Sequence, residues 1–235
     1  MKYTSYAGYH KSGADSQDRG GRLVRLQGRQ LGWSVMALVT VTAAGLAAAP
    51  YFLLDPANSR VQLDPSFTLH FPLLLVHIFA SFIALVIGWV QFIPGLRKKY
   101  PRLHRRIGIV YMGGIAVGGI TGFVVGLHTA SFIRQTAFWA LAVLWLVTGW
   151  KGYRAVRSKR IESHGQWMMR NYAVTLVAAS ARIITPILLL IYVAGHPGSN
   201  GILDALGHVL EVNIWTGLVL NLIVVEWVLM RRRGK

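Results

Sequence analysis

The chain has 235 residues, of which 54% are hydrophobic and 14% are charged. Soluble domains carry roughly 25% charged residues, so this composition excludes an ordinary soluble enzyme or binding domain. The net charge is +17 and there is no cysteine, which excludes disulfides, iron–sulfur clusters and cysteine nucleophiles.

Six apolar segments are long enough to cross a bilayer as helices, since about 20 apolar residues suffice. In chain order they cover residues 33–54, 71–95, 107–128, 132–150, 168–193 and 205–230. We therefore predict an all-α, polytopic membrane bundle of six transmembrane helices. Residues 31–235 form a single transmembrane domain that follows a polar tail, residues 1–30.

The basic residues predict how this bundle is oriented. All but three of the 25 Lys and Arg residues fall in four segments, residues 1–29, 97–106, 151–170 and 231–235. With six spans these segments share one side, and the positive-inside rule places them and both termini in the cytoplasm. The basic excess thus indicates topology and contact with anionic lipid head groups, not nucleic-acid binding. The three exceptions are Arg60 and Arg134 on the opposite side and Arg182 within a span.

A repeat is visible in spans 2 to 5. Span 2 ends with Gly-Trp and a basic segment, and His104 follows Gly88 by 16 residues. Span 4 ends in the same way, and His164 follows Gly149 by 15 residues. A tyrosine comes next in each case, Tyr111 or Tyr172. Both units run in the same direction, so spans 2–5 are predicted to form a four-helix core with parallel repeats.

Span 2 carries a stripe of small and polar residues at helical spacing, which includes His77 and Gln91. In lipid, such stripes mark helix–helix interfaces. An interhelical hydrogen bond is one interpretation of His77, and a ligand or proton-relay role is the other. A series of G-x-x-x-G steps from Gly114 to Gly126 in span 3 indicates close helix packing.

Polar residues within spans 5 and 6 are the next candidates. Arg182 lies near mid-membrane, where a charge must face protein, water or a counter-charge. Its candidate partner is Glu211 on span 6, with His208 one turn outward, and the pair is interpreted as either structural or functional. Glu226, at the inner end of span 6, is expected near Arg170 or Arg105.

The pair His104 and His164 is the candidate cofactor site. Histidine is a common ligand of haem iron, and nearby arginines could neutralise haem propionates. Haem b or a quinone would be bound by residues at the cytoplasmic end: His104, His164, Arg97, Arg105, Arg170, Tyr111 and Tyr172. No other metal site is predicted, and no hydrolase or transferase motif is present.

Several segments resemble a family of bacterial predicted membrane proteins known as DUF2306, a domain of unknown function. They are HIFASFIALVIGWVQFIPGLR (77–97), LHRRIGIVY (103–111) and HGQWMMRNYAVTLVAASARI (164–183), with Trp215, Asn221 and Glu226 in the last span. The resemblance implies a multi-pass protein of the bacterial inner membrane without an assigned activity. Matching positions are His77, Gln91, Arg97, His104, Arg105, Tyr111, His164, Trp167, Met168, Arg170, Tyr172 and Arg182.

Three functions remain open from the sequence. The first is an accessory, assembly or lipid-contacting subunit of a larger membrane complex, with lipids and other membrane subunits as partners. The second is an electron-transfer protein that resembles a membrane cytochrome b and binds haem b or a quinone at His104 and His164. The third is a proton-linked transporter that uses His77, Arg182 and Glu211.

Overall fold

The computed structural model describes residues 31–32, 34–197 and 201–233. The chain divides into two compact units, Met1–Val39 and Thr40–Lys235. In the first unit, residues 31–32 and 34–39 are helical, and the predicted tail, residues 1–30, lies outside the described residues. The second unit contains the bundle of helices.

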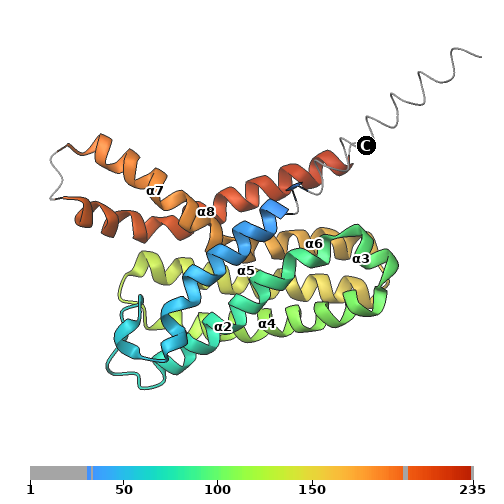
Figure 1. Cartoon of the computed structure of the whole chain (residues 1–235), viewed down its shortest axis with the longest axis horizontal. Helices are drawn as coiled ribbons and strands as arrows, with labels where there is room; N and C mark the ends of the chain where they lie inside the picture. The colour runs from blue at the N-terminus through green and yellow to red at the C-terminus, as the bar shows by residue number, and fades with distance from the viewer. Residues whose placement is uncertain (1–30, 33, 198–200, 234–235) are drawn as a thin grey trace, which may run out of the picture. The chain divides into compact units, whose positions relative to one another are not determined.

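The described part of the chain is helical and contains no strand. After helical residues 40–48 come η1 (Ala49–Leu53), η2 (Pro56–Asn58), α2 (His70–Gly88), η3 (Trp89–Phe92), α3 (Pro94–Lys99), α4 (Pro101–Leu127), α5 (Phe132–Arg157), α6 (Ile161–Thr175), α7 (Val177–Gly195) and α8 (Ile202–Arg233) (Figure 1). Six helices are long and apolar enough to cross a membrane: Ser34–Leu53, His70–Phe92, Pro101–Leu127, Phe132–Arg157, Val177–Gly195 and Ile202–Arg232. The predicted six-span, all-α bundle is confirmed.

The core is formed by α2, α4, α5 and α6, with α2 packed along α4 and α5 along α6. Glycines allow this close approach. A Cβ on Gly88 of α2 would lie 2.5 Å from the ring of Tyr172 and 2.7 Å from that of Tyr111. Both tyrosines follow their Gly-Trp glycine by 23 residues, and their ring centroids are 6.4 Å apart. The predicted repeat partners therefore meet in the middle of the core.

A buried hydrogen-bond network surrounds the Tyr111 ring, and we call it the central network: Tyr111, Trp145, Thr148, Asn171 and Thr175. The Tyr111 hydroxyl donates to Asn171 Oδ1 at 2.8 Å. The Asn171 amide donates to Trp145 O at 2.8 Å and to Thr148 Oγ1 at 2.9 Å, and the Trp145 indole donates to Thr175 Oγ1 at 2.8 Å. Because these polar atoms satisfy one another, the network needs no water in the middle of the membrane.

The two ends of the bundle differ in charge. At one end, the basic end, lie α3, the α5–α6 junction and the end of α8, with the basic segments 97–106 and 151–160. The loop end carries residues 54–69, the α4–α5 turn and the start of α8 (Figure 1). The assignment of the basic end to the cytoplasm stays a prediction.

The fifth span, predicted as one segment at residues 168–193, differs from the structure. Leu176 is a turn that separates α6 from α7, and α7 diverges from the core toward the loop end (Figure 1). The hydroxyls on both sides of the turn donate to carbonyls four residues earlier, Thr175 to Asn171 O and Ser180 to Leu176 O. Such back-bonding bends helices. The candidate span is consequently Val177–Gly195.

Candidate functional site

A cavity of about 690 Å³ lies where α7 diverges from the core. It is lined by α2, α4, α5, α7 and α8, by the end of α6, by residues 44–48 and Tyr51, and by Arg60 and Val61 of the loop before α2. Most of the lining is apolar, from side chains such as Leu74, Leu85 and Phe138. Ligand pockets have volumes of roughly 300–1,000 Å³ and are mostly apolar with a few polar groups, so this cavity has the size and character of one.

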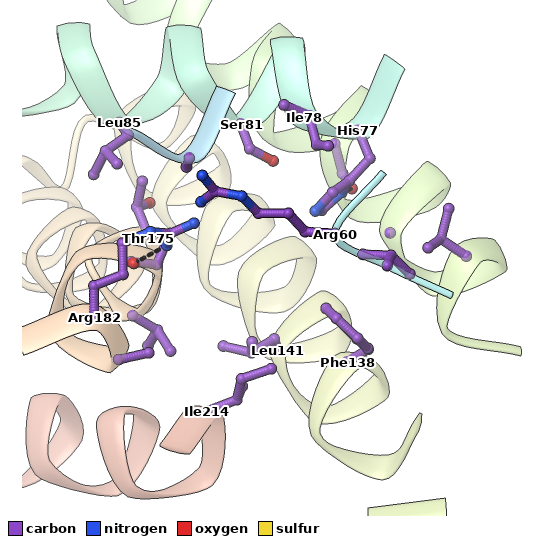
Figure 2. Close-up of a pocket in the computed structure, with 18 of the residues that line it drawn as sticks. Arg60, His77, Ile78, Ser81, Leu85, Phe138, Leu141, Thr175, Arg182 and Ile214 are labelled. Carbon is purple, nitrogen blue, oxygen red and sulfur yellow. Dashed lines mark hydrogen bonds between the residues drawn. The ribbon is translucent and has the colours of Figure 1, made fainter. Parts of the chain in front are cut away.

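Three arginines line this cavity, and each comes from a different element. Arg60 belongs to the loop 54–69, Arg134 to α5 and Arg182 to α7. Figure 2 shows the Arg60 side chain extending across the cavity so that its guanidinium points toward that of Arg182. The two are close enough for their charges to repel each other.

The guanidinium groups of Arg60 and Arg182 both donate hydrogen bonds to backbone carbonyls. Arg60 donates from Nη1 to Leu46 O at 3.2 Å, and its backbone N–H donates to the Tyr51 hydroxyl at 3.1 Å. Arg182 donates to Ala178 O, four residues earlier on α7. A carbonyl is an acceptor but not a counter-ion, so the positive charges stay uncompensated by these contacts.

Among the residues that the structure describes, no aspartate or glutamate lines the cavity. We expected Glu211 to be the partner of Arg182, but among the described residues no salt bridge joins them. Glu211 is absent from the cavity lining, whereas its neighbours Leu210 and Asn213 are part of it. His208 lies on the exposed surface of α8, 3.9 Å from Asp204 and stacked on Tyr192. The expected Arg182–Glu211 ion pair is thus not formed between the two residues as the structure describes them.

Several buried polar atoms in the lining have no hydrogen-bond partner: Ser81 Oγ, Arg134 Nε and Asn213 Oδ1. Asn213 is only 8% exposed. Its amide nitrogen donates to Thr185 Oγ1, and the Thr185 hydroxyl proton is used on Ala181 O. Asn213 Oδ1 is consequently left as an acceptor, and a buried acceptor without a donor is costly.

His77 contributes a second acceptor to the cavity. Its Nδ1 is 2.7 Å from Gly118 O, and a carbonyl only accepts, so Nδ1 carries the proton. In the neutral ring Nε2 is then an acceptor. The glycine steps of α4 make room for the ring, because a Cβ on Gly122 would lie 2.6 Å from it. Both interpretations of His77, the interhelical bond and a place at a ligand site, are compatible with this geometry.

The loop that carries Arg60 is tied to the bundle by Asp64. Its carboxylate accepts from the Ser66 hydroxyl at 2.6 Å and from His128 Nδ1 at 2.8 Å, and its backbone N–H donates to His70 Nδ1 at 2.9 Å. The bonds from Ser66, followed by the bond from His128, lower the pKa of Asp64 from 3.8 to about 2. The Phe67 ring stacks on His128 with centroids 3.9 Å apart. These contacts hold the loop, and hence Arg60, in place.

The candidate cofactor residues divide into two groups: Tyr111 and Tyr172 lie in the core, and the Tyr111 hydroxyl is 3.0 Å from Thr175 Oγ1 of the cavity lining. The others are absent from that lining. His104 and His164 are near enough for their charges to interact, and Arg97 is also near His104. His164 Nδ1 lies 2.9 Å from Gly152 O, so it donates its proton there. His104 Nδ1 is buried without a partner, as is Nε2 of Gln91. No cluster of three His, Cys, Asp or Glu residues with metal-site geometry occurs in the described residues.

The remaining basic-end candidates are distributed between packing and surface positions. Arg170 binds Glu226 through two hydrogen bonds, 2.5 and 2.9 Å, and stacks over Trp167. Of the two partners considered for Glu226, the structure therefore places Arg170 against it. Tyr172 donates to Leu85 O at 3.2 Å. Arg97 and Arg105 are exposed.

Comparison with known proteins identifies the family. A family model described as "Predicted membrane protein (DUF2306)" matches residues 74–229, which is well over half of the chain. The chain belongs to the DUF2306 family. No match was found among curated proteins or among solved structures. The match covers α2 to α8, so it includes every cavity-lining helix from α2 onward but not Arg60.

Sequence reasoning singled out Arg182 and, in the polar stripe of span 2, His77 and Ser81. It missed three other polar residues of the cavity as site candidates: Arg60, Arg134 and Asn213. A signal for the arginines was nevertheless present. The three Lys or Arg residues that fall outside the basic segments are the same three that line the cavity. A basic residue that departs from the topological charge pattern is thus a candidate for a role inside the membrane.

Proposed function

We propose that this protein binds one anionic amphiphile inside the membrane, in the cavity lined by Arg60, Arg134 and Arg182. The single observation that carries the proposal is a mostly apolar cavity whose described lining has three arginines and no carboxylate. Charges are expensive at membrane depth and need a counter-charge or water. An anionic head group supplies the counter-charge, and an alkyl chain suits the apolar walls.

This proposal gives a specific form to the lipid-contacting role expected from the sequence. A bound amphiphile could be a structural lipid or a molecule handed to a membrane partner, and assembly with other subunits stays a prediction. The transporter hypothesis also stays a prediction. His77 and Arg182 line the cavity, whereas Glu211 does not.

The test is native mass spectrometry of the full chain purified in a mild detergent. We expect a bound species of lipid-like mass that is released on unfolding and identified as an acidic amphiphile. Arg182→Gln should lose most of this species, whereas Arg102→Gln, an exposed basic-end arginine, should retain it. Full retention by Arg182→Gln and Arg60→Gln would contradict the proposal.

A second candidate function is quinone binding at the basic end. It is favoured by one observation, namely two buried nitrogens without a partner among the described residues, together with nearby Arg97. Gln91 Nε2 is a donor, and His104 Nδ1 is a donor in one tautomer of the ring. A Cβ on Gly108 would lie 3.8 Å from the Gln91 amide, so these two helices approach closely there. A quinone carbonyl would accept from such donors. Extraction and chromatography of quinones from purified wild-type and His104→Ala protein tests this candidate. Equal quinone content in both would contradict it, and a Soret band would instead indicate haem.

A further inference from the structure

We propose, resting on the function just proposed, that the ligand is a single-chain phospholipid: its phosphoryl group binds between Arg60 and Arg182, and its hydroxyl donates to an acceptor of the cavity wall. The juxtaposition that carries this inference is two convergent guanidinium groups in the same cavity as two acceptors, His77 Nε2 and Asn213 Oδ1.

The number of charges favours a phosphoryl group over a carboxylate. One guanidinium already satisfies both oxygens of a carboxylate through two parallel hydrogen bonds. Here two guanidinium groups point at one region, and Arg134 adds a third positive charge to the lining. A phosphate monoester carries about −1.5 to −2 charges at pH 7 and three acceptor oxygens. It can therefore engage both Arg60 and Arg182, whereas a carboxylate would leave one of them without a counter-charge.

The acceptors indicate what else the ligand carries. Arginine only donates, so a ligand made of an anion and an alkyl chain would leave His77 Nε2 and Asn213 Oδ1 without donors. Both groups line the cavity, and Asn213 is more than nine-tenths buried. A hydroxyl next to the phosphoryl group, as in a glycerol backbone, supplies the missing donor. Ser81 Oγ, also buried and without a partner, can bond to the same hydroxyl or to a phosphoryl oxygen.

The size of the cavity limits the number of chains. At about 690 Å³ it falls within the range of sites for small molecules, roughly 300–1,000 Å³. A ligand with one alkyl chain and a small head group suits this volume better than a two-chain phospholipid. Taken together, the charges, acceptors and volume point to a lysophosphatidate-like molecule.

The experiment compares five probes on the full chain in detergent micelles, with affinity measured by native mass spectrometry and by calorimetry. Oleoyl lysophosphatidate has all the required groups. Oleate replaces the phosphoryl group by a carboxylate, mono-oleoylglycerol removes the anion, and glycerol 3-phosphate and inorganic phosphate remove the chain. We expect lysophosphatidate to bind at least about tenfold more tightly than each of the others, because each lacks at least one class of contact, and oleate and inorganic phosphate also lack the glycerol hydroxyl.

Single substitutions test whether lysophosphatidate binds at Arg60 and Arg182. Arg60→Gln and Arg182→Gln should each weaken lysophosphatidate binding by at least about tenfold and reduce its advantage over oleate. Arg182→Lys keeps the charge but loses the planar guanidinium, so its affinity for lysophosphatidate should lie between those of wild type and Arg182→Gln. Arg102→Gln is the matched control, since Arg102 is exposed and absent from the lining. Thermal unfolding without ligand shows that each variant is folded.

The outcomes separate this inference from the proposed function. If oleate binds as tightly as lysophosphatidate and Arg182→Gln weakens both, an anionic amphiphile is bound but phosphoryl recognition is wrong. Equal binding of mono-oleoylglycerol would overturn the role of charge. If inorganic phosphate bound as tightly as lysophosphatidate, phosphoryl recognition would be supported, but the claim that the ligand is an amphiphile would be overturned. Failure of every probe to bind the folded chain would overturn both.

Discussion

The central network and the cavity are neighbouring polar regions in the same bundle. They differ in whether their polar groups have partners. In the central network, Tyr111, Asn171 and Thr175 are bonded to one another or to backbone carbonyls. In the cavity, Arg60 and Arg182 lie near each other without a carboxylate, and three further buried polar atoms have no partner. Satisfied polar groups hold helices together, whereas the unsatisfied groups of the cavity are the ones that the proposed ligand would bind.

The largest effect is expected in the central network. Asn171→Ala removes hydrogen bonds to Trp145 O, Thr148 Oγ1 and Tyr111 Oη. Interhelical hydrogen bonds in membranes average about 0.6 kcal/mol with a maximum near 1.7, so the three should cost roughly 2–4 kcal/mol. Unfolding in mixed detergent and SDS micelles measures this change. If Asn171→Ala lowered the free energy of unfolding by less than the cavity variants do, the central network would not be the main polar contribution to stability.

A slightly smaller effect is expected from the glycines at this centre. A Cβ on Gly88 would overlap two tyrosine rings at 2.5 and 2.7 Å, whereas a Cβ on Gly149 meets its neighbours at 3.3–3.4 Å. Gly88→Ala should therefore lower the free energy of unfolding by about 1–3 kcal/mol, as overpacking does. Gly149→Ala, the repeat equivalent, is the control and should cost less. Equal costs in the SDS assay would contradict the described packing.

The comparison is sharpened by two arginines in different surroundings. Arg170 has a two-bond ion pair with Glu226, so Arg170→Gln should destabilise the protein by up to about 1 kcal/mol, the range of partly exposed pairs. Arg182 has no such partner, so Arg182→Gln should leave the unfolding free energy of the ligand-free protein unchanged or raise it. It should also abolish the stabilisation by added lysophosphatidate, which Arg170→Gln should keep. The reverse pattern would refute the assignment of the two roles.

The smallest effect concerns the loop that carries Arg60. The pKa of Asp64 is about 2 in the folded protein and 3.8 in the unfolded chain, so its contribution to stability is complete above about pH 4. It is lost as the pH falls toward 2, because protonation then costs the bonds to Ser66 and His128. Asp64→Asn should lack this decline. Acid titrations of both proteins, followed by circular dichroism, check this decline, and Asp64 is expected to add no pH dependence to the stability between pH 5 and 8.

The fold was largely predictable because the bilayer limits the alternatives. Long uncharged runs and the positions of the basic residues are enough to place the spans, since only helices satisfy their backbone within a single segment. The turn at Leu176 was not predictable from hydropathy, because residues 168–193 are mostly apolar on both sides of it. Their polar residues are Arg170, Asn171, Thr175, Ser180, Arg182 and Thr185. That turn depends on side-chain hydroxyls that bond to the backbone, and it divides a segment that reads as one span.

The sequence by itself determined the membrane class, the family, the six spans and the contrast between basic segments and three isolated arginines. Only the tertiary structure decided that Arg60, Arg134 and Arg182 share one cavity, that Glu226 binds Arg170, and that Glu211 does not bind Arg182. The physical reason is that hydropathy and charge act along the chain, whereas an ion pair or a ligand site depends on which helix faces meet. The divergence of α7 from the core determines which helix faces meet, and the three isolated arginines consequently line one cavity.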